Sequence, residues 1–140
     1  MPFTTHRLMQ MFAWTRRPIC PPQESARLEL SAVIEDQGWY EFNVYADQTY
    51  VLLFGQWLAQ GVARYTPLFR NGSEKIKADA NEIGLLCQGN TITPFINGVQ
   101  MRSWQDNKFG LKTGKIGISA ASFGSGPFTV AYDWLKVSQP

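Results

Sequence analysis

The stretch Trp39-Tyr40-Glu41-Phe42-Asn43-Val44-Tyr45 decides the fold, because apolar and polar side chains alternate along it. Alternation with a period of two is typical of a β-strand that buries one face. A tight connection, Ala46-Asp47-Gln48, leads into a second alternating run, Thr49–Gly55. The two runs predict an antiparallel β-hairpin. The side chains expected to face inward are Tyr40, Phe42, Val44, Tyr50, Leu52 and Phe54.

Short runs of the same kind continue along most of the chain, separated by turn residues. Asn97-Gly98 is a strong hairpin signal, because a type I′ turn requires positive φ at both positions. Trp57–Phe69 contains Pro67 and favours an irregular edge strand, and Arg70–Ala80 is expected to be a surface loop. The remaining expected strands are Arg27–Ile34, Asn81–Gln88, Thr91–Ile96, Lys115–Ser122 and Phe128–Val137. With no convincing helical period, the sequence predicts an all-β fold, a two-sheet antiparallel sandwich.

Composition limits the classes of function. The 140 residues suffice for one domain with its own core. Thirteen Lys+Arg against eleven Asp+Glu leave a net charge of +2, so we expect no nucleic-acid partner. The one histidine, His6, lies near the N-terminus, which excludes a multi-histidine zinc site and disfavours triad catalysis. No run of 18 apolar residues is present, so no membrane span is expected.

The N-terminal residues differ from the rest. Residues 1–25 are expected to form an arm or a substitute edge strand, and residues 26–140 the sandwich domain. Pro18, Pro21 and Pro22 disfavour a regular helix or central strand and mark a linker. The short apolar segment before them is followed by Thr15-Arg16-Arg17-Pro18, which gives no clear signal peptide.

Several motifs occur in a recognisable order. The hairpin over residues 39–52 is followed by Phe95-Ile96-Asn97-Gly98-Val99, by Gly114-Lys115-Ile116-Gly117-Ile118 and by a closing Val130–Val137 strand with an Asp-aromatic pair. This order resembles the concanavalin A-like and laminin G-like jelly-roll superfamily. It is closest in pattern to the 3-keto-disaccharide hydrolase domain, whose relatives include lectin-like modules of bacterial surface proteins.

The resemblance implies a jelly roll with an extracellular or cell-surface location. It specifies the fold better than the function, because one fold serves many functions. Members carry two or three more strands before the Trp39 strand, so this chain is expected to lack some N-terminal strands. Either the sandwich is trimmed, or residues 1–34 replace the missing edge, or a second copy of the chain covers that edge as a homo-oligomer.

Exposed tryptophans near loops suggest a ligand site. Trp104 precedes the amides of Gln105 and Asn107, and polar amides beside an aromatic ring suit hydroxyl-rich ligands. We therefore expect Trp104, Gln105, Asn107 and Trp57 to bind a carbohydrate. Alternatively, these tryptophans cap the ends of the core. Trp39 and Trp134 are expected to be core residues.

Catalytic residues are not assigned. Glycosidases require two carboxyl groups facing one cleft. Glu35-Asp36 fall in a turn, Glu29 and Glu41 lie on separate segments, and the acids are expected to be solvated. Asp133 is expected to point outward if its neighbours point inward. The sequence therefore disfavours glycan cleavage.

No cofactor is expected. Calcium is kept as an alternative because Asp106-Asn107 and Asp79-Ala80-Asn81 are rich in oxygen ligands, although they form no Asp-x-Asp cluster. In related domains a strand cysteine near Cys87 pairs with one before the Trp39 strand, so the resemblance offers a Cys20–Cys87 disulfide. Two separate thiols are an equal alternative.

Three functions from different classes follow. The preferred one is a non-catalytic carbohydrate-binding, lectin-like module. The second is a sugar hydrolase of the 3-keto-disaccharide hydrolase type, disfavoured by the lack of paired acids. The third is a structural or self-association module, favoured by the short N-terminal half.

Overall fold

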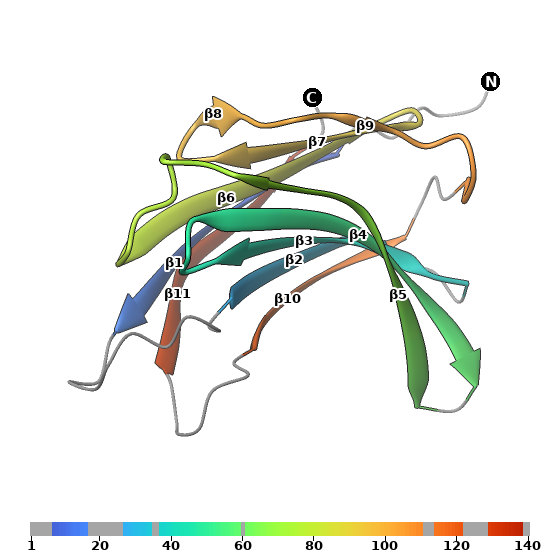
Figure 1. Ribbon diagram of the computed structural model, residues 1–140, viewed down its shortest axis with the longest axis horizontal. Coiled ribbons are helices and arrows are strands. Elements are labelled where there is room, and N and C mark those ends of the chain that lie inside the picture. Colours follow the sequence, from blue (N-terminus) through green and yellow to red (C-terminus); the bar gives the residue numbers. More distant parts are fainter. Residues whose placement is uncertain are drawn as a thin grey trace.

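Residues 7–16, 27–34, 37–59, 61–110, 114–121 and 129–138 are described by a computed structural model. The described residues form strands and turns without a helix, and the strands make two antiparallel sheets that pack face to face (Figure 1). This arrangement confirms the predicted all-β sandwich. Among the described residues there is no helix long and apolar enough to cross a membrane.

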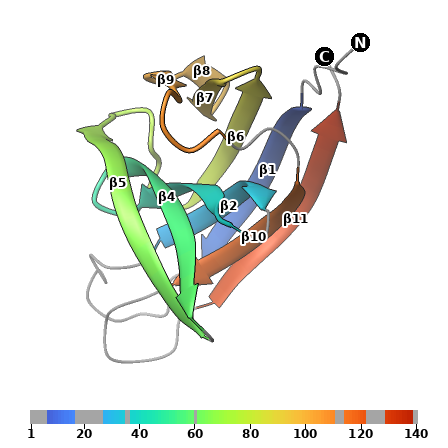
Figure 2. The same ribbon diagram turned by 90° about the vertical axis from the view of Figure 1, so that its right-hand side faces the viewer.

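Among the described residues, one sheet has five strands and the other six, and Figure 2 shows how the two sheets are layered. Sheet B has the order β10 (Lys115–Ala121), β2 (Arg27–Ile34), β3 (Trp39–Tyr45), β4 (Thr49–Ala59) and β5 (Val62–Gly72). Sheet A has the order β11 (Thr129–Ser138), β1 (Arg7–Arg16), β6 (Ala80–Gln88), β7 (Thr91–Ile96) and β8 (Val99–Gln100), and β9 (Trp104–Gln105) also pairs with β7.

The core lies between the sheets, and the alternating hairpin supplies much of it. The six inward-facing side chains predicted for this hairpin are all buried, so that expectation is confirmed. Phe42 on β3 meets fully buried Ile83 and Ile96 from sheet A in one cluster. Full burial of each such side chain contributes about 1.5–3 kcal/mol relative to an exposed position.

The connections between strands follow the turn chemistry of the sequence. Asn97 and Gly98 have φ values of 51° and 78°, which confirms the predicted turn with positive φ at both positions. The Asn97 side chain also donates to the carbonyl of Lys75 at 2.6 Å and accepts from the backbone N–H of Glu82 at 2.8 Å. This side chain therefore ties the hairpin turn to the loop that precedes β6.

Strand β1 differs from the expected arm or edge strand. It pairs with β6 on one side and with β11 on the other, so it is an interior strand of sheet A. An interior position gives the backbone N–H and C=O groups on both sides of the strand hydrogen-bond partners. The proline-rich linker that was expected after it lies outside the described residues.

Two further expectations need correction. The segment Trp57–Phe69 is not one strand, because its first residues complete β4 and the rest belongs to β5, the edge strand of sheet B. Trp134 is not a core residue but 39% exposed, because β11 is the edge strand of sheet A. Trp39 is buried, as expected, but lies on the side of sheet B that faces away from the core.

Candidate functional site

The candidate site lies on the side of sheet B that faces away from the core, which we name the outer face. Along β3, the odd-numbered residues Trp39, Glu41, Asn43 and Tyr45 lie on this face, because the even-numbered residues fill the core and side chains alternate. The register aligns two rows of outer-face residues across the sheet. One row is Ser119, Glu29, Asn43, Val51 and Arg70, and the next is Gly117, Ser31, Glu41, Leu53 and Pro67.

Two carboxylates are buried in the middle of the outer face. Glu29 and Glu41 are only 8% and 5% exposed. The two oxygens of Glu29 accept hydrogen bonds from Arg27 Nε and Ser119 Oγ, and Glu41 Oε2 accepts one from Trp39 Nε1 at 2.9 Å. Buried charges require such donors. The expectation that the acids are solvated is therefore wrong for Glu29 and Glu41. The two residues are also diagonal neighbours in the β2–β3 register, with their backbones about 7–8 Å apart.

Asn43 lies between these carboxylates and is fully buried. Neither its Nδ2 nor its Oδ1 atom has a hydrogen-bond partner among the described residues. A buried amide without partners costs about 1–3 kcal/mol, so a group of this kind in a folded protein calls for an explanation. A hydroxyl group, which both donates and accepts, is chemically matched to the two unpaired atoms.

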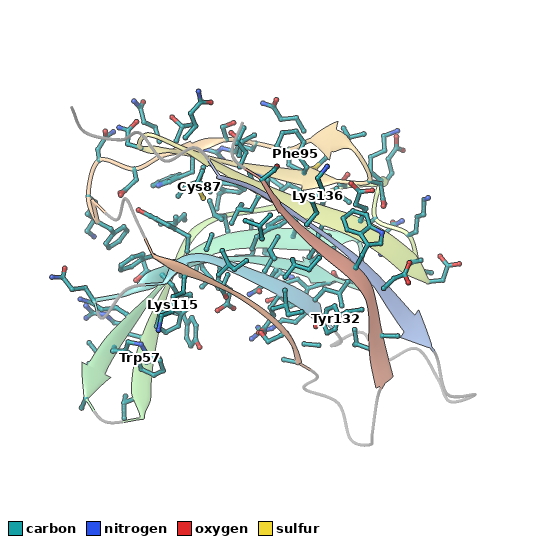
Figure 3. The ribbon with its side chains drawn as sticks, turned by 180° about the vertical axis from the view of Figure 1, so that it is seen from behind. Trp57, Cys87, Phe95, Lys115, Tyr132 and Lys136 are labelled. Carbon is teal, nitrogen blue, oxygen red and sulfur yellow. The ribbon has the colours of Figure 1, made fainter. Side chains whose placement is uncertain are left out.

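Three aromatic rings form a cluster at one end of the outer face, which we name the aromatic cluster. The Trp39 ring lies 4.9 Å from the Trp57 ring and 5.9 Å from the Tyr65 ring, measured between centroids. Trp39 is buried, whereas Trp57 and Tyr65 are each 51% exposed. Trp57 is carried by the β4–β5 hairpin, which projects from the sandwich (Figure 3). The exposed rings of Trp57 and Tyr65 thus pack on the buried ring of Trp39.

Gly55 explains how the Trp39 ring reaches its partners. Gly55 is opposite Trp39 in the β3–β4 register and opposite Tyr65 in the β4–β5 register. A Cβ atom at Gly55 would lie 2.3 Å from Cε2 of Trp39, so any other residue would displace the indole ring. Glycine at this position lets the ring lie across β4.

The electrostatics of the outer face link the aromatic cluster to the carboxylates. Burial, followed by the charges of Glu41 and Glu29, raises the pKa of the Tyr65 hydroxyl above its usual range. The Tyr65 hydroxyl therefore stays protonated at neutral pH and is available as a donor. Trp57, Tyr65 and Glu41 together offer ring faces, a donor and an acceptor within one region.

Cationic side chains gather around Tyr45 at the other end of the outer face. The guanidinium carbons of Arg27 and Arg70 lie 5.8 Å and 5.4 Å from the centre of the Tyr45 ring. Arg27 Nη1 donates to the Tyr45 hydroxyl at 3.2 Å, and Arg70 is 3.7 Å from the Asp47 carboxylate. The outer face therefore runs from aromatic through acidic to basic residues.

The four residues predicted to bind a ligand do not form one cluster. Trp57 belongs to the outer face, whereas Trp104 packs against the core, with its ring centroid 6.4 Å from that of the inward-facing Phe69. Gln105 and Asn107 are exposed beside Trp104. The alternative reading, in which a tryptophan caps the core, describes the packing of Trp104.

Asp106, between those two amides, anchors its loop. Its carboxylate accepts hydrogen bonds from the backbone N–H groups of Lys108, Phe109 and Gly110 and from the Tyr40 hydroxyl. Burial alone would raise the pKa of the Asp106 carboxyl, but these hydrogen bonds outweigh burial and lower it. Hydrogen-bond donors surround both oxygens, so this carboxylate does not fit the calcium site considered from the sequence.

Metal and disulfide chemistry find no support in the part of the chain that is described. No group of three or more His, Cys, Asp or Glu side chains is placed there to hold a metal ion. Cys87 packs against the core, and because Cys20 lies outside the described residues, the Cys20–Cys87 disulfide stays a prediction beside the alternative of two separate thiols. Burial raises the pKa of the Cys87 thiol to about 12, so it is a poor nucleophile.

Sequence reasoning overlooked Glu29, Glu41, Asn43 and Tyr65 as members of one site. The signal was present in β3, where the strand pattern places Glu41 and Asn43 on one face with Trp39. Adding the antiparallel register of β2 would have brought Glu29 beside them.

Comparisons with known proteins establish the fold. Neither a protein-family model nor a curated protein sequence matches the chain. Carbohydrate-binding module CBM66 from Bacillus subtilis has a TM-score of 0.70 at 9% identity, over 96% of this chain and 76% of that one. Sheep galectin-11, solved with glycerol, has a TM-score of 0.66 at 11% identity, over 99% and 93% of the two chains.

An enzyme shares the same architecture. A family 16 glycoside hydrolase from Bacteroides ovatus, solved with a mixed-linkage glucan product, has a TM-score of 0.64 at 9% identity, over 97% of this chain and 70% of that one. The closer resemblance to the 3-keto-disaccharide hydrolase domain stays a prediction. With both sheets and these three likenesses in agreement, the chain has the concanavalin A-like jelly-roll sandwich fold.

Proposed function

We propose that this protein is a non-catalytic carbohydrate-binding module that binds a glycan on the outer face of sheet B. The observation that carries the proposal is the aromatic cluster beside buried polar groups. The open rings of Trp57 and Tyr65 provide apolar faces, and the Glu41 carboxylate, which accepts from Trp39 Nε1, lies beside the buried ring on which they pack. Sugars match this pattern because their rings have apolar faces and hydroxyl edges.

The similar structures add support of a general kind. They include a carbohydrate-binding module, a galectin and a glycan hydrolase, but at 9–11% identity they establish only the fold. Arg70, at the basic end of the outer face, is exposed and adds a donor for a longer ligand.

Glycan hydrolysis is the second candidate because it requires two carboxyl groups on one face. Glu29 and Glu41 are diagonal neighbours on the outer face, with backbones about 7–8 Å apart. Inverting glycosidases hold their carboxyl groups about 6.5–9.5 Å apart. However, the Glu29 carboxylate is held by Arg27 and Ser119 of its own chain, one donor on each oxygen, so it acts as a structural acceptor. The binding function is therefore preferred.

A calorimetric titration with a panel of neutral and acidic oligosaccharides tests the proposal. We expect at least one glycan to bind, and Trp57→Ala to weaken it at least about tenfold, because loss of an aromatic anchor costs more than 1 kcal/mol. Leu58→Ala is the matched control, since Leu58 is similarly exposed on the same hairpin but lies outside the aromatic cluster. Equal losses in the two variants, or no binding across the panel, would contradict the proposal. Release of reducing sugar that stops in Glu41→Gln would instead support the hydrolase.

A further inference from the structure

Both sheets end on the same side of the sandwich. Strand β11 is the terminal strand of sheet A and β10 that of sheet B, and Figure 2 shows the two on one side of the molecule. Within the described part of the chain, β11 pairs only with β1 and β10 only with β2. The Tyr132 hydroxyl on β11 donates to the carbonyl of Ser119 on β10 at 2.6 Å, which joins the two edges at one point.

Apolar side chains on these edge strands face the core side and yet are exposed. Leu135 pairs with Met11, which pairs with fully buried Ile83, so Leu135 lies on the core-facing side of sheet A. The same reasoning places Val137 on that side through Met9. Leu135 and Val137 are nevertheless 43% and 46% exposed.

Strand β10 shows the same pattern across the gap between the sheets. Ile118 pairs with fully buried Leu30 and so points to the core side of sheet B, but it is 38% exposed. The apolar layer between the sheets thus continues to this edge, where no other described strand covers it. A long edge strand that combines unpaired backbone groups with exposed apolar side chains is a template for pairing with another chain.

We propose that two copies of this chain pair antiparallel along the free edge of β11, about a two-fold axis. A second copy is the natural occupant because the edge complements itself. Antiparallel pairing centred on Leu135 sets Leu135 against Leu135 of the partner subunit and Trp134 against Lys136 of the partner subunit. The same core-side apolar residues are then covered on both copies.

The charges of the strand favour this antiparallel orientation. Figure 3 shows Tyr132 and Lys136 along β11, and Asp133 lies between them in sequence. Parallel pairing would set Asp133 and Lys136 against their own copies, where like charges repel. Antiparallel pairing instead brings the acidic half of one strand toward the basic half of the other, and it places Lys136 near the Trp134 ring of the partner subunit.

Light scattering after size exclusion tests the dimer with the full chain. We expect a mass twice the 15.8 kDa of one chain at micromolar concentration. Leu135→Lys should raise the dissociation constant at least about tenfold, because it sets two like charges against each other at the two-fold axis. Val99→Lys is the matched control, since Val99 is 41% exposed on β8, at the opposite end of the same sheet.

Hydrogen exchange supplies a second readout that does not depend on a variant. Backbone amides of β11 should gain protection as the concentration of the wild-type protein rises, whereas those of β8 should not. A wild-type monomer at hundreds of micromolar, or equal dissociation of the Val99→Lys and Leu135→Lys variants, would overturn the proposal. The glycan titration is independent of this result, because the outer face of sheet B is not part of the β11 edge.

Discussion

The substitution Asn43→Leu tests whether the buried amide on the outer face has structural partners. The Asn43 amide is fully buried with neither polar atom paired among the described residues. An unsatisfied buried amide costs about 1–3 kcal/mol, and leucine has a similar size without that cost. We therefore expect Asn43→Leu to gain about 1 kcal/mol of folding stability, which raises the Tm by about 4 °C in a domain of this size.

Glycan affinity should stay within about twofold of the wild-type value, because the Asn43 amide is fully buried and a ligand at the aromatic cluster does not reach it. Thermal unfolding followed by circular dichroism, together with calorimetric titration, measures both quantities on the same sample.

A second buried asparagine provides the control. Asn81 is 6% exposed, but its side chain exchanges hydrogen bonds of 2.8 Å with the backbone of Lys77 and accepts one of 3.0 Å from Asn97. Asn81→Leu should therefore lower the Tm. If Asn43→Leu lowers the Tm as much as Asn81→Leu does, Asn43 has structural partners and the reasoning about the outer face fails.

Three further predictions follow from individual contacts. Gly55→Ala should displace the Trp39 ring, destabilise the fold by about 1–3 kcal/mol and weaken glycan binding. Gly72→Ala is the control and should leave stability and glycan binding unchanged, because a Cβ atom at Gly72 would meet nothing closer than 3.6 Å. The folded-state pKa of Asp106 lies below its unfolded value, so the ionised carboxylate stabilises the fold above about pH 4 and this stabilisation is lost on acidification. The Tm difference between wild type and Asp106→Asn should therefore be present at pH 7 and shrink at lower pH. A Tm difference that does not change with pH would contradict this. In a variant without the other cysteine, Cys87 should alkylate much more slowly at pH 8 than a free thiol, because burial raises its pKa to about 12, and labelling at the rate of a free thiol would contradict this.

Local alternation was enough to predict the central hairpin. The even positions of β3 and those of β4 from Tyr50 to Phe54 are apolar and fill the core, and the Asn97-Gly98 turn has the φ values that its residues favour. These features depend on neighbours in sequence, so one chain reveals them.

The outer face could not be predicted in the same way. Glu29 and Glu41 look like solvent-facing residues of two separate strands, and their burial depends on packing with Trp39 and on the partners Arg27 and Ser119. These contacts join strands β2, β3 and β10, so they require the register of the whole sheet.

The N-terminal strand illustrates the same limit. Strand β1 pairs with β6 and β11, which lie in the middle and at the end of the chain. Local patterning therefore indicated only an arm or an edge, because nothing near β1 in sequence reports the two strands that enclose it.

Resonance mapping of a glycan on the protein tests the central claim most directly. In a two-dimensional ¹⁵N–¹H NMR titration, we expect the largest shifts at the indole N–H groups of Trp39 and Trp57 and at the backbone amide of Tyr65. Shifts confined to Trp104, Gln105 and Asn107 would place the ligand beside β9 of sheet A and contradict binding at the outer face of sheet B.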